Sequence, residues 1–371
     1  FLAGYCSGIV DNCIVEDSII GGGNTIGGLI GYTYFSKISN SSVIGIKVNS
    51  ASMLGGLVGK CWGGKIEKSS ALGTLKCDSL CGGLIGVSRN FGNICESWSN
   101  CNIKVDCAAG GLIGAADLCS VNQCFTCGLI KSSRDTGGII GRANTTFLND
   151  SYSTVFAEGD SCVAGLIGNS SQNFISHCYT VSYIESKEYR GALIGLSDKD
   201  EVLSALWDTE TTGISKEPLG IPTTIDAMKN KKTFEDTGWN VSTRGEDTFP
   251  WSIDEGKGVP YLTFSGNQNR TLNLGETFSD SPLVRIAPEQ NQYDLNDVVV
   301  IEPSRPDIAS FTSLKVFDSE IKTHVTYYNK IPLVMAGNWV IDGIIFRRAY
   351  FSDIEQIQQI GKSPDYPLYG Y

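Results

Sequence analysis

The pentapeptide Gly27-Gly28-Leu29-Ile30-Gly31 recurs along this chain at nearly constant spacing. Copies of it, some with one substitution, start at Gly55, Gly82, Gly110, Gly137 and Gly191. The copy Gly165-Leu166-Ile167-Gly168 lacks the first glycine, and a worn copy, Leu2-Ala3-Gly4, precedes them all. The first apolar residue of each copy follows that of the previous copy by 27 or 28 residues. A repeat of this length predicts a solenoid in which each period forms one coil.

Two further columns repeat with the same period. An apolar residue stands about nine positions after the first apolar residue of each copy, at Val10, Ile38, Ile66, Ile94, Val121, Leu148 and Ile175. Three positions later comes a small residue, at Cys13, Ser41, Ser69, Ser97, Cys124, Ser151 and Cys178. Apolar and polar residues alternate in between, as in Ile103-Lys104-Val105, which indicates strands. We therefore expect an all-β chain whose residues 1–196 form a parallel β-solenoid of about eight coils, roughly 4.8 Å apart.

The paired glycines have a structural explanation in such a fold. A glycine at a corner permits a positive φ and a close approach of stacked backbones, where a Cβ would collide. A phosphate-binding loop is the alternative, but residues 27–31 lack both the Lys-Ser/Thr pair of a P-loop and the GxGxxG spacing.

The Gly-Gly-Leu-Ile-Gly copies, with an Ile-x-x-Cys/Ser column between them, resemble the GLUG-motif repeats of bacterial and eukaryotic surface proteins. The resemblance covers about residues 1–265 and implies a β-solenoid on a secreted, often adhesin-like chain. It also implies that residues 197–264, with Trp207, Trp239 and Trp251, close the solenoid as a cap. A cap of this kind covers strand edges and core side chains at an open end.

The composition changes after residue 264. Residues 265–348 contain short apolar runs separated by Asn, Asp, Gly and Pro, which predicts an antiparallel β-sandwich that serves as a spacer or docking module. In residues 349–371, the capping box from Ser352 to Glu355 predicts a short helix that ends at Gly361. The sequence after it resembles the segment that opens a GLUG solenoid, so residues 349–371 are expected to start a following solenoid unit.

The charge and hydropathy of the chain exclude several classes of partner. A net charge of -11 and a pI near 4.8 argue against binding to nucleic acid or to anionic membranes. No apolar run approaches the ~18 residues of a membrane span. The resemblance to GLUG-motif surface proteins implies an extracellular location, at a cell surface.

The cysteines divide into two groups. Cys13, Cys124 and Cys178 occupy the small column and are expected to be buried thiols. Two other pairs, Cys101 with Cys127 and Cys81 with Cys107, hold nearly equivalent places on neighbouring coils, which predicts disulfides and an oxidising compartment. Metal ligation is the alternative, but Cys124-x-x-Cys127 has no matching second pair and the chain has 2 histidines, so we expect no metal site and no cofactor.

Six N-glycosylation sequons indicate a secreted glycoprotein. They begin at Asn40, Asn144, Asn149, Asn169, Asn240 and Asn269.

Four aromatic residues, Trp98, Phe125, Tyr152 and Tyr179, follow the small column on successive coils. In-register coils should stack these rings into a ladder on one face. One interpretation is an outward ladder that stabilises the solenoid, and the other is a platform on which sugar rings stack.

Two classes of function remain open. A structural or adhesive surface protein is favoured by the repeats, and a carbohydrate-binding module that uses the ladder is close to it. A polysaccharide-active β-helix enzyme is the alternative, but acidic and basic residues share no column and no Ser/His/Asp or Cys/His set is present, so we expect no enzyme.

The two ends of the chain predict self-assembly. The chain starts within a repeat and ends where a solenoid should begin, which indicates one unit of a tandem array or of a head-to-tail filament of copies of itself. The residues expected at that interface are Phe1, Leu2, Tyr366, Pro367, Leu368, Tyr369 and Tyr371.

Overall fold

The structure is a computed structural model. It describes residues 2–16, 18–50, 52–243, 249–253, 255–256 and 259–264, together with the backbone of six strands between residues 284 and 346. The chain divides into two compact units, Phe1–Gln268 and Asn269–Tyr371, which are described separately.

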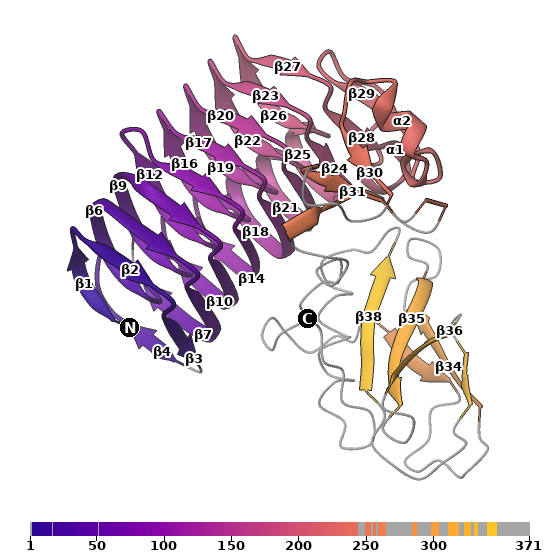
Figure 1. Cartoon of the computed structure of the whole chain (residues 1–371), viewed down its shortest axis with the longest axis horizontal. Coiled ribbons are helices and arrows are strands. Elements are labelled where there is room, and N and C mark those ends of the chain that lie inside the picture. Colours follow the sequence, from indigo (N-terminus) through magenta and orange to yellow (C-terminus); the bar gives the residue numbers. More distant parts are fainter. Residues whose placement is uncertain are drawn as a thin grey trace. The chain divides into compact units, whose positions relative to one another are not determined.

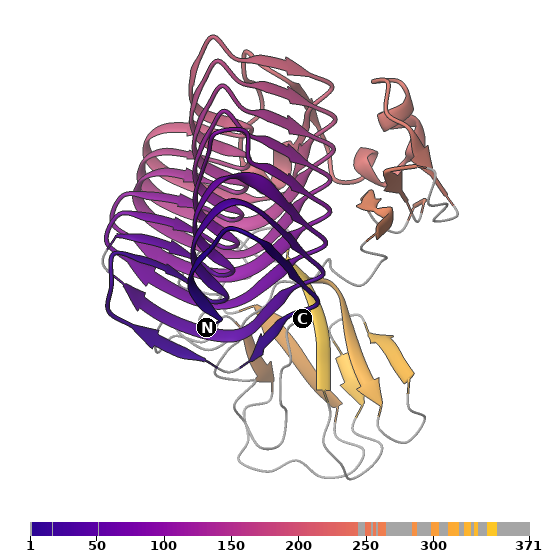
Figure 2. The same ribbon diagram turned by 60° about the vertical axis from the view of Figure 1, so that its left-hand side comes forward.

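The first unit is an all-parallel β-solenoid whose coils stack along one axis (Figures 1 and 2). In the described residues, the solenoid has about seven turns, and eight strands of sheet A stack along its axis, one for each rung. Each coil begins with strands of sheet A: β1 (Ala3–Cys6), β6 (Ile30–Ser39), β9 (Val58–Glu67), β12 (Ile85–Arg89), β16 (Ile113–Asp117), β19 (Ile140–Asn144), β22 (Ile167–Ser171) and β26 (Ile194–Asp198). After a corner, sheet A continues with β2 (Ile9–Asp11), β13 (Asn93–Cys95), β17 (Ser120–Asn122), β20 (Phe147–Asn149), β23 (Phe174–Ser176) and β27 (Glu201–Leu203).

Sheet B forms the remaining side of each coil. Most of this side is formed by β3 (Ile14–Glu16), β4 (Ile19–Gly21), β7 (Ser42–Ser50), β10 (Ser70–Cys77), β14 (Trp98–Val105), β18 (Phe125–Gly137), β21 (Tyr152–Ala164), β24 (Tyr179–Thr180), β25 (Tyr183–Gly191), β28 (Leu206–Asp208) and β29 (Ile221–Thr223). Short strands precede the glycine pairs: β5 (Thr25–Gly27), β8 (Met53–Gly55), β11 (Leu80–Gly82) and β15 (Ala108–Gly110).

The predicted in-register stacking is confirmed. The backbone N–H of Leu57 donates to the carbonyl of Leu84 on the next coil at 2.9 Å, and the N–H of Leu84 donates to Leu112 at the same distance. These leucines and their equivalents form one column of the core, and the Ile38 to Ile175 column forms another. The spacing read from the sequence therefore fixes which residues lie above one another.

The small column closes each corner with a side-chain hydrogen bond. The hydroxyl of Ser97 accepts from the N–H of Ser69 on the neighbouring coil at 3.2 Å and donates to the carbonyl of Cys95 at 2.8 Å. Ser41 and Ser69 make the equivalent bonds. Buried corner amides are thus satisfied coil by coil, which explains why small hydroxyl residues recur there.

The prediction of positive φ at the paired glycines is wrong, whereas that of close approach is confirmed. The left-handed conformation instead occurs at the residue before the small column, namely Asn12, Asn40, Lys68, Glu96, Gln123, Asp150, His177 and Ser204. A Cβ on Gly28 would collide with the carbonyl of Gly56 on the next coil, and one on Gly111 with that of Gly138. The last copy has Ala192 at this position, where no further coil lies against it.

The solenoid extends past the predicted boundary at residue 196. Strand β27 pairs with β23, β28 pairs with β24, and β29 pairs with β28, all in parallel. Parallel pairing uses only backbone groups, so it continues without another glycine pair.

The end cap, residues 209–223, then closes this end of the solenoid. It contains α1 (Thr209–Thr212), whose N-cap Asp208 accepts from the N–H of Thr211 at 2.8 Å. Trp207 is completely buried here, and its indole N–H donates to the carbonyl of Ile214 at 2.8 Å. The carboxylate of Glu217 accepts from the N–H groups of Ala192 and Leu193. On inner coils the equivalent amides bond to the next coil, so Glu217 replaces a missing neighbour.

The described residues between 224 and 264 form a second closing element, which we call the lateral cap. It contains the 3-10 helix η1 (Ala227–Lys229), α2 (Lys231–Glu235) and a small sheet of β30 (Val241–Ser242), β31 (Trp251–Ser252) and β32 (Tyr261–Leu262). Its buried side chains Met228, Phe234, Trp239, Trp251, Ile253 and Leu262 form one apolar cluster with Phe125, Tyr152, Tyr179 and Leu206 of the solenoid. The expected cap therefore has two parts with different partners.

The second unit contains two antiparallel sheets of three described strands. One has the order β33 (Val284–Ala287), β34 (Val298–Pro303), β37 (Lys330–Pro332), and the other β36 (Thr323–Tyr327), β35 (Phe311–Asp318), β38 (Val340–Phe346). The antiparallel strands agree with the sequence, and the sandwich itself stays a prediction. The predicted helix and the rest of residues 349–371 lie outside the described residues.

Candidate functional site

The aromatic ladder predicted from the sequence is present at the starts of β14, β18, β21 and β24. Ring centroids of Trp98 and Phe125 lie 5.6 Å apart, those of Phe125 and Tyr152 5.2 Å, and those of Tyr152 and Tyr179 4.9 Å. Successive planes differ by 9°, 8° and 3°, so the rings are stacked. The stacking follows from strand register, because Trp98 pairs with Phe125, and Phe125 with Tyr152.

The ladder does not present its rings to solvent. Phe125, Tyr152 and Tyr179 are at most 1% exposed, because the lateral cap covers them. Trp251 lies 5.8 Å from the ring of Tyr152 and 5.7 Å from that of Tyr179. The interpretation of these three rings as a sugar platform is therefore wrong. Burial of their large apolar area holds the lateral cap against the solenoid.

Two polar contacts fix the position of the lateral cap. The phenol of Tyr179 donates to the carbonyl of Pro260 at 2.6 Å, and the indole N–H of Trp251 donates to Oδ1 of Asp150 at 2.9 Å. Burial raises the pKa of Asp150, although the bond from Trp251 opposes that effect.

A different group of aromatic side chains on sheet A is exposed or partly exposed. We define the aromatic patch as Tyr5, Tyr32, Tyr34, Phe35 and Trp62. The rings of Tyr5 and Tyr32 lie 5.6 Å apart, and those of Tyr34 and Phe35 4.9 Å apart, edge to face. Tyr34 is 45% exposed and Phe35 54%, which is unusual for side chains that gain free energy on burial.

A cation lies within the patch. The ammonium of Lys60 lies 5.3 Å from the ring centroid of Tyr32 and 5.6 Å from that of Trp62. Both distances fit cation–π contacts. Arg89 pairs in register with Trp62 on the following rung and is exposed. Flat rings beside cations can stack on a sugar and bind acidic groups that it carries.

The strand register brings the residues of the aromatic patch together, and their spacing in the repeat is visible in the sequence. Tyr5, Tyr32 and Lys60 pair across β1, β6 and β9, and Tyr34 pairs with Trp62. These positions lie three and five residues after the first apolar residue of each copy of the pentapeptide. Odd offsets from the inward leucine select the outward face of a strand. Our sequence reasoning followed only the column after the small residues and missed this one.

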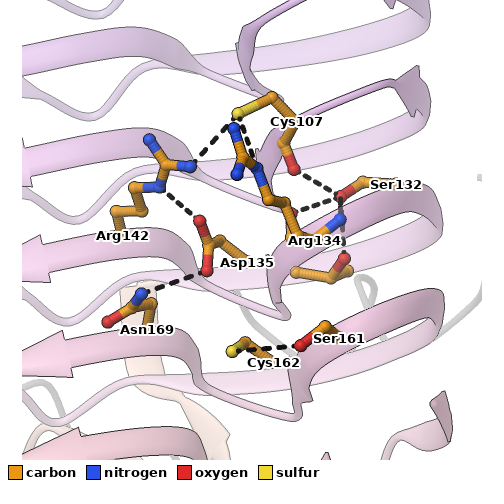
Figure 3. A network of polar contacts seen from close by, with 9 residues as sticks. Cys107, Ser132, Arg134, Asp135, Arg142, Ser161, Cys162 and Asn169 are labelled. Atoms are coloured by element: carbon orange, nitrogen blue, oxygen red, sulfur yellow. Dashed lines mark hydrogen bonds and ion pairs between the residues drawn. The ribbon is translucent and has the colours of Figure 1, made fainter. Parts of the chain in front are cut away.

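A polar network lies at the corner where β18 passes towards the next coil (Figure 3). The buried carboxylate of Asp135 accepts from Nε of Arg142 and, at 3.1 Å, from Nδ2 of Asn169. Asp135 has a positive φ of 54°, and Cys162 holds the equivalent corner one coil later with a φ of 56°. Burial raises the pKa of the Cys162 thiol, and the nearby Asp135 carboxylate raises it further.

Cys107 lies at the edge of this network. Its sulfur accepts hydrogen bonds from Nη2 of Arg142 at 3.1 Å and from Nε of Arg134 at 3.4 Å. Figure 3 shows both guanidinium groups directed at that sulfur. The hydroxyl of Ser132 donates to the carbonyl of Cys107 at 2.8 Å and fixes its backbone. Two cations thus converge on a partly exposed thiol.

The predicted disulfides are wrong for this structure, because none of the 13 cysteines is bridged. Cys127 pairs in register with Asn100, so Cys101 is one residue out of step. A shift of one residue turns side chains to opposite faces of a strand, so the two sulfurs do not face each other. Cys81 pairs with Ala109, two residues from Cys107.

Several thiols instead pack inside the solenoid, as predicted for the small column. Cys124 and Cys178 are completely buried and donate to corner carbonyls at 3.4 and 3.1 Å, in the place of the serine hydroxyls. Cys13 is only partly buried. Burial raises the pKa of Cys124 and Cys178, and it raises that of Cys101 to about 12.

The sequon asparagines occupy different environments. Asn40, Asn144 and Asn240 are exposed, although the amides of Asn40 and Asn144 donate to Asp11 and Asp117. Asn149 accepts from the hydroxyl of Ser176, and Asn169 donates to Asp135 in the polar network. A glycan on Asn169 would replace one of its amide hydrogens beside that network. Asn269 lies outside the described residues.

Of the residues predicted at an assembly interface, the structure describes Leu2, which is 55% exposed. Phe1, Tyr366, Pro367, Leu368, Tyr369 and Tyr371 lie outside the described residues.

Within the described ranges, no group of three or more His, Cys, Asp or Glu side chains is placed to hold a metal ion. None of the helices that the structure describes combines the length and the hydropathy needed to cross a bilayer.

Comparison with known families agrees with the repeat. The family model described as the GLUG motif matches residues 22–49, which span one period and include all of β6 and nearly all of β7. The β-solenoid built on that period is consistent with a GLUG repeat protein. Comparisons with curated proteins and with solved structures gave no match.

Proposed function

We propose that this GLUG-type solenoid is an extracellular structural protein of a cell surface, in which it serves as a stiff rod. The observation that carries the proposal is the pairing of eight rungs in register around one continuous apolar core. Backbone hydrogen bonds then run along the axis from coil to coil, so bending or shearing the rod must break many of them together. The GLUG match fits a surface or structural protein.

Labelling of intact producing cells tests the proposed location. A membrane-impermeant amine reagent should modify Lys187, whose side chain is 80% exposed, before the cells are broken. Mass mapping reads the site. Modification of Lys187 only after lysis would contradict a surface location.

A non-catalytic role is part of the proposal. A polysaccharide-active enzyme needs carboxylates that can exchange protons with substrate. Glu67 is engaged by Lys37 at 2.8 Å and by Lys65, which together hold its pKa down at about 2. Asp135 is engaged by Arg142. These acids therefore serve as ion-pair partners, and an assay on acidic polysaccharides should detect no chain cleavage.

A second proposed activity is glycan binding, and the aromatic patch is the observation that favours it. The buried ladder cannot bind sugars, so the proposed sugar-binding rings are Tyr34 and Trp62, which pair in register on adjacent rungs. The neighbouring Lys60 favours acidic sugars. Glycan-array binding should fall at least about tenfold in Tyr34→Ala with Trp62→Ala, given ~1 kcal/mol for each ring contact. Phe147→Ala, at a ring that is 53% exposed elsewhere on sheet A, is the matched control. Equal binding by both variants would contradict glycan binding at the patch.

Head-to-tail self-association is the finer part of the proposal. Its support is the pairing mode of the first coil, because a segment from the expected C-terminal interface of one copy can pair in parallel with β1 of the next, as β6 does within the chain. Sedimentation velocity should show species that grow with concentration, and Leu2→Asp should slow that growth. A single monomeric species at every concentration would overturn the filament.

The second unit is proposed to be an antiparallel sandwich that spaces or docks solenoids. Its two three-stranded antiparallel sheets support this arrangement. Expression of residues 269–371 alone should give a cooperative thermal transition with a β-type circular dichroism spectrum, and a random-coil spectrum would contradict it.

A further inference from the structure

Cys107 differs chemically from the cysteines inside the solenoid. Cys101 and Cys124 are buried, and their sulfurs donate to backbone carbonyls. The sulfur of Cys107 instead accepts hydrogen bonds from two guanidinium groups, at 3.1 and 3.4 Å. Positively charged donors stabilise a thiolate relative to a thiol, and a thiolate is the nucleophilic form.

The two arginines are held for this role in different ways. Arg142 is anchored by the buried carboxylate of Asp135, which is itself fixed by Asn169 at 3.1 Å. That anchoring leaves Nη2 directed at the sulfur (Figure 3). Arg134 is exposed and its backbone N–H bonds to the hydroxyl of Ser132 at 3.2 Å. One cation is therefore preorganised and the other faces solvent.

The side chains linked to the sulfur by hydrogen bonds carry a net positive charge. Arg134 and Arg142 contribute two positive charges, and Asp135 contributes one negative charge. A partly exposed thiol in an electropositive setting is the arrangement expected of a reactive cysteine.

We propose that Cys107 is a nucleophilic modification site that forms a mixed disulfide with anionic low-molecular-weight disulfides. The thiolate attacks one sulfur of the disulfide, a new S–S bond to Cys107 forms, and the original S–S bond breaks. The second half of the disulfide leaves as a thiolate and takes a proton from water, so no other oxidant is required. Arg134 favours reagents that carry carboxylates, because it faces the approaching molecule.

Native full-length chain should be treated in parallel with glutathione disulfide, which is anionic, and with cystamine, which is cationic. Mass mapping of the cysteine peptides over time gives the rate at each site. We expect Cys107 to react first with glutathione disulfide, and roughly tenfold more slowly with cystamine. Cys95 is the internal reference, because it is also partly exposed but burial raises its pKa.

Two substitutions test the role of the cations. Arg134→Gln leaves no buried charge behind, and it should reduce the preference for the anionic disulfide by several fold without changing the circular dichroism spectrum. Arg142→Lys keeps an ion partner for Asp135 but removes the second guanidinium nitrogen, which contacts the sulfur. It should therefore slow the reaction of Cys107 with both disulfides. Lys216→Gln, at an exposed cation of the end cap, is the matched control and should change neither rate.

The proposal is overturned if Cys107 reacts no faster than Cys95, or if Arg134→Gln leaves the ratio of the two reagents unchanged. This test does not depend on the location or the glycan binding proposed above, since it measures only the chemistry of the folded chain.

Discussion

The indole N–H of Trp251 donates to the carboxylate of Asp150 at 2.9 Å, across 101 residues of sequence. Asp150 occupies the left-handed corner immediately before the small column of the sixth coil, with a φ of 43°. The next residues, Ser151 and Tyr152, lie in the small column and the aromatic ladder. One corner of the solenoid thus supplies both the polar anchor and part of the apolar surface that hold the lateral cap.

The charge of Asp150 should make stability depend on pH. Because burial raises its pKa, the native state binds this proton more tightly than the unfolded chain does. The free energy of unfolding therefore falls as the pH rises through the native pKa of this carboxyl. Asp150→Asn keeps an acceptor for Trp251 and tolerates a positive φ. Urea unfolding should show the variant more stable than the native chain at pH 7, with the difference gone below about pH 4.

Asp150→Ala is the control for that experiment. It removes the acceptor and leaves the indole N–H of Trp251 unsatisfied, which should cost about 1–3 kcal/mol at every pH. If Asp150→Asn were as unstable as Asp150→Ala at pH 7, the negative charge itself would be needed for the contact.

Removal of one ring from the ladder should release the lateral cap. Tyr152 is stacked between Phe125 and Tyr179 and also contacts Trp251. Tyr152→Ala should therefore cost about 3–5 kcal/mol by creating a cavity under the cap. Limited proteolysis should then cut within residues 224–264 while the solenoid stays resistant. Phe147→Ala, at an exposed ring, should change stability by less than about 0.5 kcal/mol. Equal proteolysis of both variants would show that the ladder does not hold the cap.

The solenoid was predictable because one period specifies both backbone pairing and side-chain direction. Copies of the pentapeptide that are spaced 27 or 28 residues apart place Leu57 over Leu84, since parallel strands pair residue by residue. The same rule shows why the disulfide prediction failed. Cys101 and Cys127 are 127 − 101 = 26 residues apart, one fewer than the 27 that separate the pair Asn100 and Cys127. One residue is enough to turn a side chain to the other face.

The resemblance implied a cap with Trp239 and Trp251, but neither the position of the lateral cap over the ladder nor the polar network could be predicted from the sequence. Trp251 meets Tyr152 through a long-range contact that no period encodes. The sequence therefore predicts the stacking of the ladder but not its burial. The cluster around Cys107 joins residues from four coils at a corner where the chain changes direction. Corner geometry depends on left-handed residues such as Asp135, and these have no common side-chain type.

The second glycine of each pair should be intolerant of any side chain. A Cβ on Gly111 would collide with the carbonyl of Gly138 and lie 3.0 Å from Cβ of Thr126. Gly111→Ala should therefore cost about 3 kcal/mol or more in thermal or urea unfolding. Gly21→Ala is the matched control, because no atom lies within 4 Å of its Cβ position. A small effect of Gly111→Ala would mean that the coils separate easily at this point.

Glu217 should protect the last coil from fraying. Its carboxylate accepts from the N–H groups of Ala192 and Leu193, whereas an inner residue such as Leu112 donates to the carbonyl of Ile139 at 2.9 Å. Glu217→Ala leaves two amides of the last coil without their acceptor, at about 1–3 kcal/mol for each buried group. Amide hydrogen exchange at Ala192 and Leu193 should then accelerate by roughly tenfold or more, while Leu112 is unaffected. Glu217→Gln keeps one carbonyl oxygen, so its exchange rates should fall between those of the native chain and the alanine variant. Unchanged exchange in Glu217→Ala would mean that other groups of the end cap, such as the buried Trp207, close the solenoid without this carboxylate.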